Sequence, residues 1–130
     1  MGEVEVVAEL SPEVVAKVAV EVAKYPERRA AVKSALRYAQ AEHGWVSGGV
    51  VQAVAQLLEL EPIEVYEVAT FYDMFYTEPV GRHQLRVCTN VSCMLRGAGS
   101  IVELLEHKLG VKVGGTSEDG RVTLLVAECL

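Results

Sequence analysis

The chain has 130 residues, of which 51% are hydrophobic and 23% are charged, and its formal net charge at pH 7 is -6. This is enough apolar sequence to bury the core of one compact domain or of two small units. An acidic chain is poorly suited to bind nucleic acid, because nucleic-acid-binding surfaces concentrate Lys and Arg against phosphate groups.

Neither a membrane span nor a secretion signal is indicated by the sequence. The long uncharged stretch from Trp45 to Leu58 is interrupted by glycines and is too short to cross about 30 Å of hydrocarbon. The first ten residues are acidic, whereas a signal peptide begins with basic residues. We therefore expect a soluble, intracellular protein without direct membrane insertion. In a reducing compartment, its three cysteines are better explained by metal binding or catalysis than by disulfides.

Four short amphipathic helices are predicted in roughly the first 76 residues. Ser11 and Pro12 are typical of a helix N-cap and first helical residue. Gly44 is placed to end the second helix, the third is expected from about Gly49 to Leu60, and the fourth begins at Pro62. Helical spacing predicts four inward stripes, formed by Val15, Val18, Ala19 and Val22, by Val32, Ala35, Leu36 and Ala39, by Val50, Val54, Leu57 and Leu58, and by Val65, Val68, Ala69 and Tyr72. We expect an N-terminal four-helix bundle over residues 1–79.

A second unit, residues 80–130, is predicted after the Pro- and Gly-containing loop from Thr77 to Gly81. The segment HQLRVC alternates as a half-buried strand does, a helix follows from about Ala98 to Leu109, and the apolar run RVTLLVAEC indicates a buried strand. A strand–helix–strand unit has parallel strands whose C-terminal ends meet at one edge. Cys88 and Cys129 are therefore expected at the same edge, with Cys93 just before the helix.

The loop around Cys93 is expected to suit thiolate ligands. Amides near Cys93, Leu95 and Gly97 are predicted at or near a helix N-terminus, where N–H groups and the helix dipole stabilise negative charge. Gly97 and Gly99 would let the backbone approach the sulfurs, and Arg96 could offset their charge.

The spacing of the cysteines leaves several kinds of site open. There is no C-x-x-C, which is typical of thioredoxin disulfides and zinc ribbons, and a plant-type ferredoxin would need a third cysteine two residues after Cys93. Inert thiols, an iron–sulfur site, and a zinc or reactive-thiol site all remain compatible with the spacing. The zinc alternative includes His83 as a fourth ligand.

Other candidate residues have simpler interpretations. His43 and His107 are expected to be solvated or to cap helices. Phe71, Tyr72, Phe75 and Tyr76 are expected to pack in the core or between the units, although aromatic residues are also enriched at interfaces. The sequence shows no paired carboxylates or glycine-rich phosphate loop, so no catalytic residue is predicted.

Three segments together resemble the family of the iron–sulfur E subunit of NADH-quinone oxidoreductase, respiratory complex I. They are RVCTNVSCMLRGA, VAECL and VYEVATFYDMF. The resemblance implies an α+β fold in which the helical bundle precedes a thioredoxin-like α/β ferredoxin domain holding one [2Fe-2S] cluster. Cys88 and Cys93 match the family's first pair of ligands, and Cys129 matches the first member of the second pair. The fourth ligand would follow Leu130, so the resemblance implies a thioredoxin-like domain that is incomplete at its C-terminus.

The resemblance also implies a function. The protein would be an electron-transfer subunit without independent activity, and a flavin- and NADH-binding partner subunit would carry FMN and NADH. Related subunits of NAD-linked hydrogenases and formate dehydrogenases make those complexes alternative parents. The implied location is cytoplasmic, with a peripheral arm on the cytoplasmic face of the inner membrane as one setting. The alternative from a different class is an adaptor that binds structural zinc or has no cluster.

Overall fold

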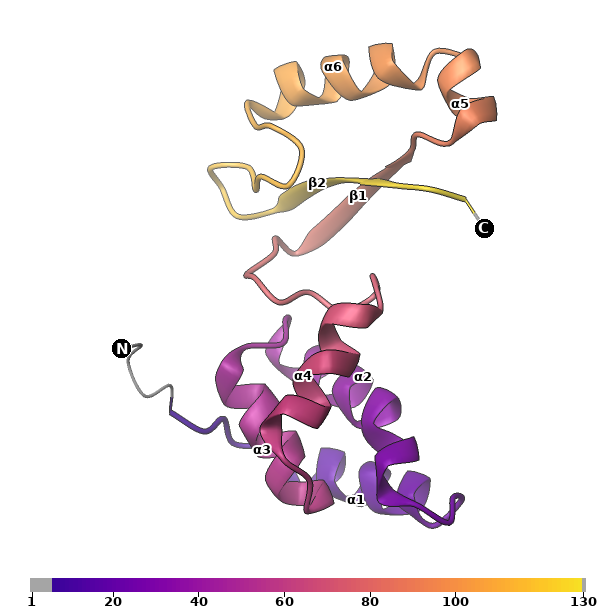
Figure 1. Cartoon of the computed structure of the whole chain (residues 1–130). Helices are drawn as coiled ribbons and strands as arrows, with labels where there is room; N and C mark the ends of the chain where they lie inside the picture. Colours follow the sequence, from indigo (N-terminus) through magenta and orange to yellow (C-terminus); the bar gives the residue numbers. More distant parts are fainter. Residues whose placement is uncertain (1–5, 130) are drawn as a thin grey trace. The chain divides into compact units, whose positions relative to one another are not determined.

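The computed structural model describes residues 6–129 (Figure 1). They divide into two compact units, Met1–Pro79 and Val80–Leu130. The first contains α1 (Pro12–Val22), the 3-10 helix η1 (Arg28–Ala31), α2 (Val32–His43), α3 (Gly48–Leu58) and α4 (Pro62–Phe71). The second contains β1 (His83–Cys88), α5 (Val91–Leu95), α6 (Ala98–Leu109) and β2 (Val122–Ala127). Helices and a small sheet occur together, as the predicted α+β class requires.

The helices of the first unit begin and end at the signals that the sequence carries. The Ser11 hydroxyl accepts a hydrogen bond from the N–H of Val14 at 3.3 Å, which caps α1. The Ser47 hydroxyl caps α3 in the same way through Val50 N–H, at 3.2 Å. Gly44 ends α2 with a φ of 86°, a left-handed conformation that glycine adopts without steric cost. Helix α3 ends slightly earlier than predicted, because Glu59 takes a left-handed conformation.

The core of the first unit confirms the predicted stripe of α2 and corrects that of α1. All four predicted residues of α2 are buried. In α1, Val14 and Val18 are buried, whereas Val15 is 37% exposed and Ala19 is exposed. Val14 therefore takes the inward place predicted for Val15. Of the other stripes, Leu57, Val68 and Tyr72 are half-buried, and Val50, Val54, Leu58, Val65 and Ala69 are buried.

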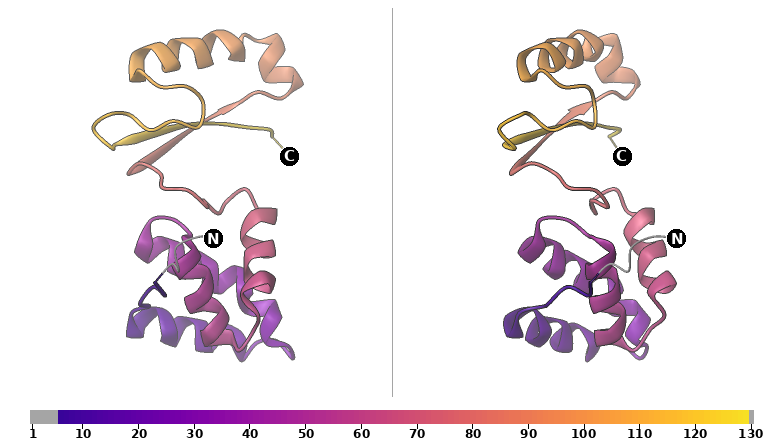
Figure 2. Two further views of the ribbon diagram at one scale, coloured as in Figure 1. Left: turned by 60° about the vertical axis from the view of Figure 1, so that its left-hand side comes forward. Right: turned by 90° about the vertical axis from the view of Figure 1, so that its left-hand side faces the viewer.

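The second unit is a βαβ unit, as predicted. Strands β1 and β2 pair in parallel, with His83 opposite Val122 and Cys88 opposite Ala127. Helix α6 lies along one side of the pair in both views of Figure 2. Its residues Val102, Leu105 and Leu109 are half-buried, and Gly110 ends it in the left-handed conformation. The helix thus returns the chain to a strand that ends beside the end of β1.

Strand β2 is less buried than the sequence predicts. Only Thr123 and Leu124 are buried, and Val126 is 42% exposed. The reason is that the described residues form a two-stranded sheet with α6 on one face, so most of β2 has a solvent-facing side. In strand β1, His83, Leu85 and Arg86 are exposed, and the other residues are half-buried.

Candidate metal centre

Parallel pairing brings two of the three cysteines to one edge of the sheet. Cys88 is the last residue of β1 and is paired with Ala127, the last residue of β2, so Cys129 follows two residues beyond the pairing. The N–H of Thr89 donates to the Ala127 carbonyl at 2.9 Å and extends the contact between the two chain segments. The predicted convergence of Cys88 and Cys129 is therefore present in the structure.

Cys93 lies within the short helix α5 rather than in an open loop. The Asn90 side chain accepts a hydrogen bond from Val91 N–H at 2.8 Å and begins this single helical turn. The N–H of Gly97 donates to the Met94 carbonyl at 3.1 Å, so it is already paired within the turn. The donor role predicted for Gly97 is therefore wrong. A five-residue helix is too short to leave a periodic pattern in the sequence.

The glycines after Cys93 affect the backbone conformation and do not approach the sulfurs. Gly97 has a φ of 98°, the left-handed region in which a side chain would be strained, and it is the residue that connects α5 to α6. A Cβ atom added at Gly99 would meet the Met94 sulfur at 3.9 Å, an ordinary contact distance. Neither position shows the predicted close approach of the backbone to a cysteine sulfur.

The three thiols are close enough to affect one another. The pKa of Cys88 is lowered by a hydrogen bond from the N–H of Asn90, then by one from the Cys93 thiol and one from the N–H of Cys129. The pKa of Cys93 is raised, because its thiol donates to Cys88 and because it is partly desolvated. Cys88 is therefore the more acidic thiol of this pair.

Asn90 connects the two cysteine-bearing segments, and sequence reasoning gave it no role. Its side-chain Nδ2 donates to the Cys129 carbonyl at 3.1 Å and to the Cys129 sulfur at 3.3 Å. Beside it, the Thr89 hydroxyl donates to the Glu128 carboxylate at 3.0 Å. An Asn between a strand and a helix is a typical N-cap residue, so the sequence could have indicated the capping role. The contact of Asn90 with Cys129 depends on the tertiary fold.

His83 is too far from the cysteines to complete a zinc site. It is the first residue of β1 and Cys88 is the last, so the two are separated by about 16 Å of extended chain. The Cys3His alternative that uses His83 is therefore wrong. Within residues 6–129, no three His, Cys, Asp or Glu side chains gather in a way that could hold a single metal ion.

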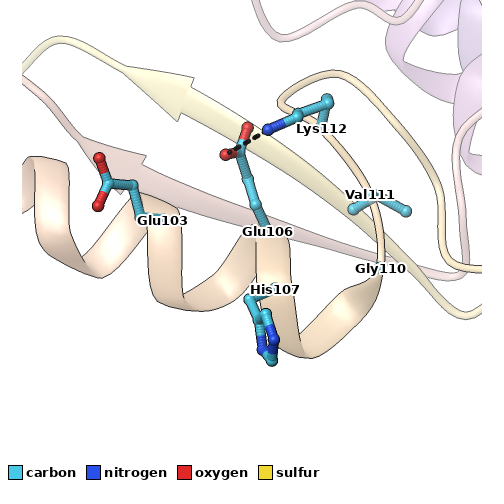
Figure 3. A pocket seen from close by; sticks show the side chains of 6 residues that line it. All are labelled: Glu103, Glu106, His107, Gly110, Val111 and Lys112. Carbon is cyan, nitrogen blue, oxygen red and sulfur yellow. Dashed lines mark hydrogen bonds and ion pairs between the residues drawn. The ribbon is translucent and has the colours of Figure 1, made fainter.

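A depression of about 580 Å³ lies at the far end of α6 from the cysteines (Figure 3). Glu106 accepts hydrogen bonds from the N–H of Val113 at 3.1 Å and from Lys112 Nζ at 3.4 Å. Figure 3 shows His107 pointing away from both Glu106 and Lys112. These contacts hold the loop after α6 against the helix, which is a structural role.

Comparison with known families shows to which family the chain belongs. A model of the thioredoxin-like [2Fe-2S] ferredoxin family matches residues 18–130. The chain belongs to this family. A [2Fe-2S] cluster is therefore the cofactor supported for this ferredoxin-family chain, and the resemblance carried by the three sequence segments is confirmed.

Curated relatives of this ferredoxin-family chain are E subunits of NADH-quinone oxidoreductase. The chain is 51% identical over 108 residues to the E 2 subunit of Rhizobium meliloti (strain 1021), with 83% of this chain and 64% of the relative covered. It is 43% identical over 106 residues to the E subunit of Escherichia coli (strain K12), with 82% and 64% covered. The E subunit of Rickettsia conorii is 43% identical over 110 residues, with 82% and 66% covered. The chain spans just under two thirds of the length of these relatives.

The residues at the sheet edge fit the family's cluster. Thiolates are the usual ligands of [2Fe-2S] clusters, and the edge supplies three thiols, two half-buried and one exposed. The Asn90 amide donates to the Cys129 sulfur, and the N–H groups of Asn90 and Cys129 lower the pKa of Cys88. Such donors stabilise thiolate ligands and the negative charge of a cluster.

Proposed function

We propose that the protein transfers electrons through a [2Fe-2S] cluster held by Cys88, Cys93 and Cys129. A [2Fe-2S] cluster accepts and gives up single electrons and takes four ligands in all. These three cysteines are the ligands that we assign within the described residues. The observation that carries the assignment is the pairing of Cys88 with Ala127 at the end of the two strands, which brings Cys129 to the edge where the Asn90 amide donates to its sulfur at 3.3 Å.

The parts of the second unit have separate tasks in this proposal. Strand pairing brings Cys88 and Cys129 to one edge, and the turn α5 brings Cys93 to the same place. The backbone N–H groups and the Asn90 amide place positive ends of dipoles at the sulfurs, so added negative charge is stabilised there. The chain thus binds the cofactor and adjusts its potential, while the redox change itself takes place on the metal.

We further propose that the protein is a non-catalytic subunit of an NADH-quinone oxidoreductase. The relatives that carry this name support the assignment. The electrons would come from NADH through the FMN of a flavin- and NADH-binding partner subunit. An NAD-linked hydrogenase or formate dehydrogenase is the alternative parent, and the proposed location is cytoplasmic, in a peripheral arm. No helix among residues 6–129 is long and apolar enough to cross a membrane.

The first unit is proposed to be a four-helix bundle domain over residues 1–79 that contacts a partner, and residues 80–130 the [2Fe-2S] domain. Phe75 is buried and Tyr72 and Tyr76 are half-buried, as predicted for packing, but Phe71 is 79% exposed. The Phe71 ring packs edge-to-face against Tyr72 at 5.0 Å between centroids, so it is held in place at the surface. Large exposed aromatic residues are typical of protein interfaces.

The ligand assignment is tested by Cys88→Ser and Cys93→Ser in the full-length protein, with Ser92→Ala as the matched control in the same turn. We expect both cysteine variants to lose iron, acid-labile sulfide and the visible absorption of the cluster, while the helical signal in circular dichroism remains. Ser92→Ala should retain all of them. Normal iron and sulfide in either cysteine variant would contradict the assignment. Bound zinc without visible absorption in the unmutated protein would favour the adaptor alternative.

A further inference from the structure

Asn90 uses both ends of its side chain and its backbone N–H at the sheet edge. Its Oδ1 accepts from Val91 N–H and begins α5, while its Nδ2 donates to the carbonyl and the sulfur of Cys129. Its backbone N–H also acts on the Cys88 thiol and lowers the pKa of that thiol. Asn90 therefore lies between Cys88, the last residue of β1, and Cys129, two residues beyond the end of β2.

We infer that Asn90 is a positioning residue that holds Cys129 beside Cys88 and raises the reduction potential of the cluster by donating to the Cys129 sulfur. This inference rests on the proposed cluster ligands. The segment at Cys129 lies beyond the last paired residue of β2, Ala127, so it is not fixed by the strand ladder. Its carbonyl and sulfur are both held by one amide group, which limits the directions in which the sulfur can point.

The expected effect on the potential follows from charge. The reduced cluster is more negative than the oxidised cluster, and an N–H donor to a ligand sulfur stabilises the more negative state. Removal of the donor should therefore make reduction less favourable and move the midpoint potential to more negative values. Replacing the donor by a carboxylate should move it further in the same direction.

The helix-capping role can be separated from the contact with Cys129. Asn90→Ser keeps an oxygen that can cap α5, because Ser is among the best N-cap residues, but its side chain is too short to bridge to Cys129. Asn90→Asp keeps both the shape and the cap and replaces Nδ2 by an acceptor. Thr89→Val is the matched control, because it removes the neighbouring link between the same segments, Thr89 to Glu128, without touching a sulfur.

The test is a redox titration of the cluster-loaded full-length variants, followed by electron paramagnetic resonance of the reduced state. We expect the midpoint to fall from wild type to Asn90→Ser and again to Asn90→Asp, with a smaller change in Thr89→Val. An unchanged midpoint and spectrum in Asn90→Ser would overturn the inference. A change in Thr89→Val as large as that in Asn90→Ser would also overturn it, because the effect would then not require donation to a sulfur.

A second measurement does not need the cluster. In the reduced, cluster-free protein, alkylation of each cysteine is followed by mass spectrometry, with Cys93 as the internal reference. Cys129 should react several times faster in Asn90→Ser than in wild type, because its sulfur is no longer held. An unchanged rate overturns the positioning role even if the variant cannot be loaded. Failure of the proposed function gives a different result. The cysteine variants would then retain iron, or the unmutated protein would lack the visible absorption of the cluster, at any alkylation rate of Cys129 in Asn90→Ser.

Discussion

The N–H of Gly81 donates a hydrogen bond to the hydroxyl of Thr123 at 2.6 Å, in the buried part of the second unit. Thr123 is 1% exposed, and its hydroxyl also lies 2.7 Å from that of Thr116. Thr123 is therefore a buried polar residue in an apolar strand, where the sequence predicts only apolar side-chain packing. Gly81 is itself buried, and a Cβ atom there would lie 3.0 Å from the carbonyl carbon of Arg121.

Thr123→Val should destabilise the second unit by about 1–3 kcal/mol, because the Gly81 N–H would lose its acceptor in a buried place. Chemical denaturation followed by a probe in the second unit measures this loss. Thr116→Val is the control, since it removes the hydroxyl pair but leaves the Gly81 bond, and its loss should be smaller. Equal stability of Thr123→Val and wild type would show that water replaces the hydroxyl.

The uneven burial of β2 gives a second prediction. Leu124 is fully buried, whereas Val126, on the same side of the strand by alternation, is 42% exposed. Leu124→Ala should reduce the free energy of unfolding by about 2–5 kcal/mol, as for other buried leucines. Val126→Ala should cost much less. If the two losses are alike in denaturant titrations of the full-length protein, Val126 is buried there by something other than residues 6–129.

Acid should weaken the link between the N-terminal segment and α2. The carboxylate of Glu42 accepts a hydrogen bond from Ser11 N–H at 3.0 Å, and hydrogen bonds from the Ser11 hydroxyl and N–H lower the pKa of Glu42 below its ordinary value of 4.5. Because the folded pKa is the lower one, this stabilisation is present above pH 4.5 and disappears as pH falls through the folded value.

Glu42→Gln tests this dependence. The variant should be less stable than wild type at pH 7, and the difference should shrink as pH falls below 4.5. Thermal unfolding at a series of pH values measures it. Glu13→Gln, at an exposed residue of α1 that pairs with Lys17 in the next turn, is the control and should show a smaller difference at neutral pH. A Glu42→Gln difference that grows in acid would contradict the lowered pKa of Glu42.

Local signals and chain topology explain what the sequence could predict. Ser11, Gly44 and Gly110 mark helix ends because capping depends on a few neighbouring residues. The meeting of Cys88 and Cys129 follows from the strand–helix–strand order alone. The predicted inward face of α1 is right at Val18 and wrong at Val15, whose place Val14 takes, because valines surround this helix and its spacing fits more than one face. The role of Asn90 could not be predicted, because its contact with Cys129 spans 39 positions and depends on the fold.

The proposed partner gives a prediction for activity. The purified protein should not oxidise NADH with an artificial electron acceptor, because the NADH and FMN sites are assigned to the partner subunit. Addition of the flavin- and NADH-binding subunit should allow NADH to reduce the cluster, which visible absorption and electron paramagnetic resonance can follow. Steady NADH turnover by the protein alone, after contaminating flavoprotein has been excluded, would contradict the assignment.

Arg96 gives the last prediction, which concerns charge near the cluster. It follows α5 directly, three residues after Cys93, and is exposed. Arg96→Glu replaces a cation by an anion close to a centre that becomes more negative on reduction, so the midpoint potential should fall. Lys108→Glu makes the same change of charge near the far end of α6, and its effect should be smaller because solvent and salt screen distant charges. A redox titration at low and high salt measures both variants. If Arg96→Glu and Lys108→Glu shift the midpoint equally, the effect comes from the net charge of the protein rather than from the position of Arg96.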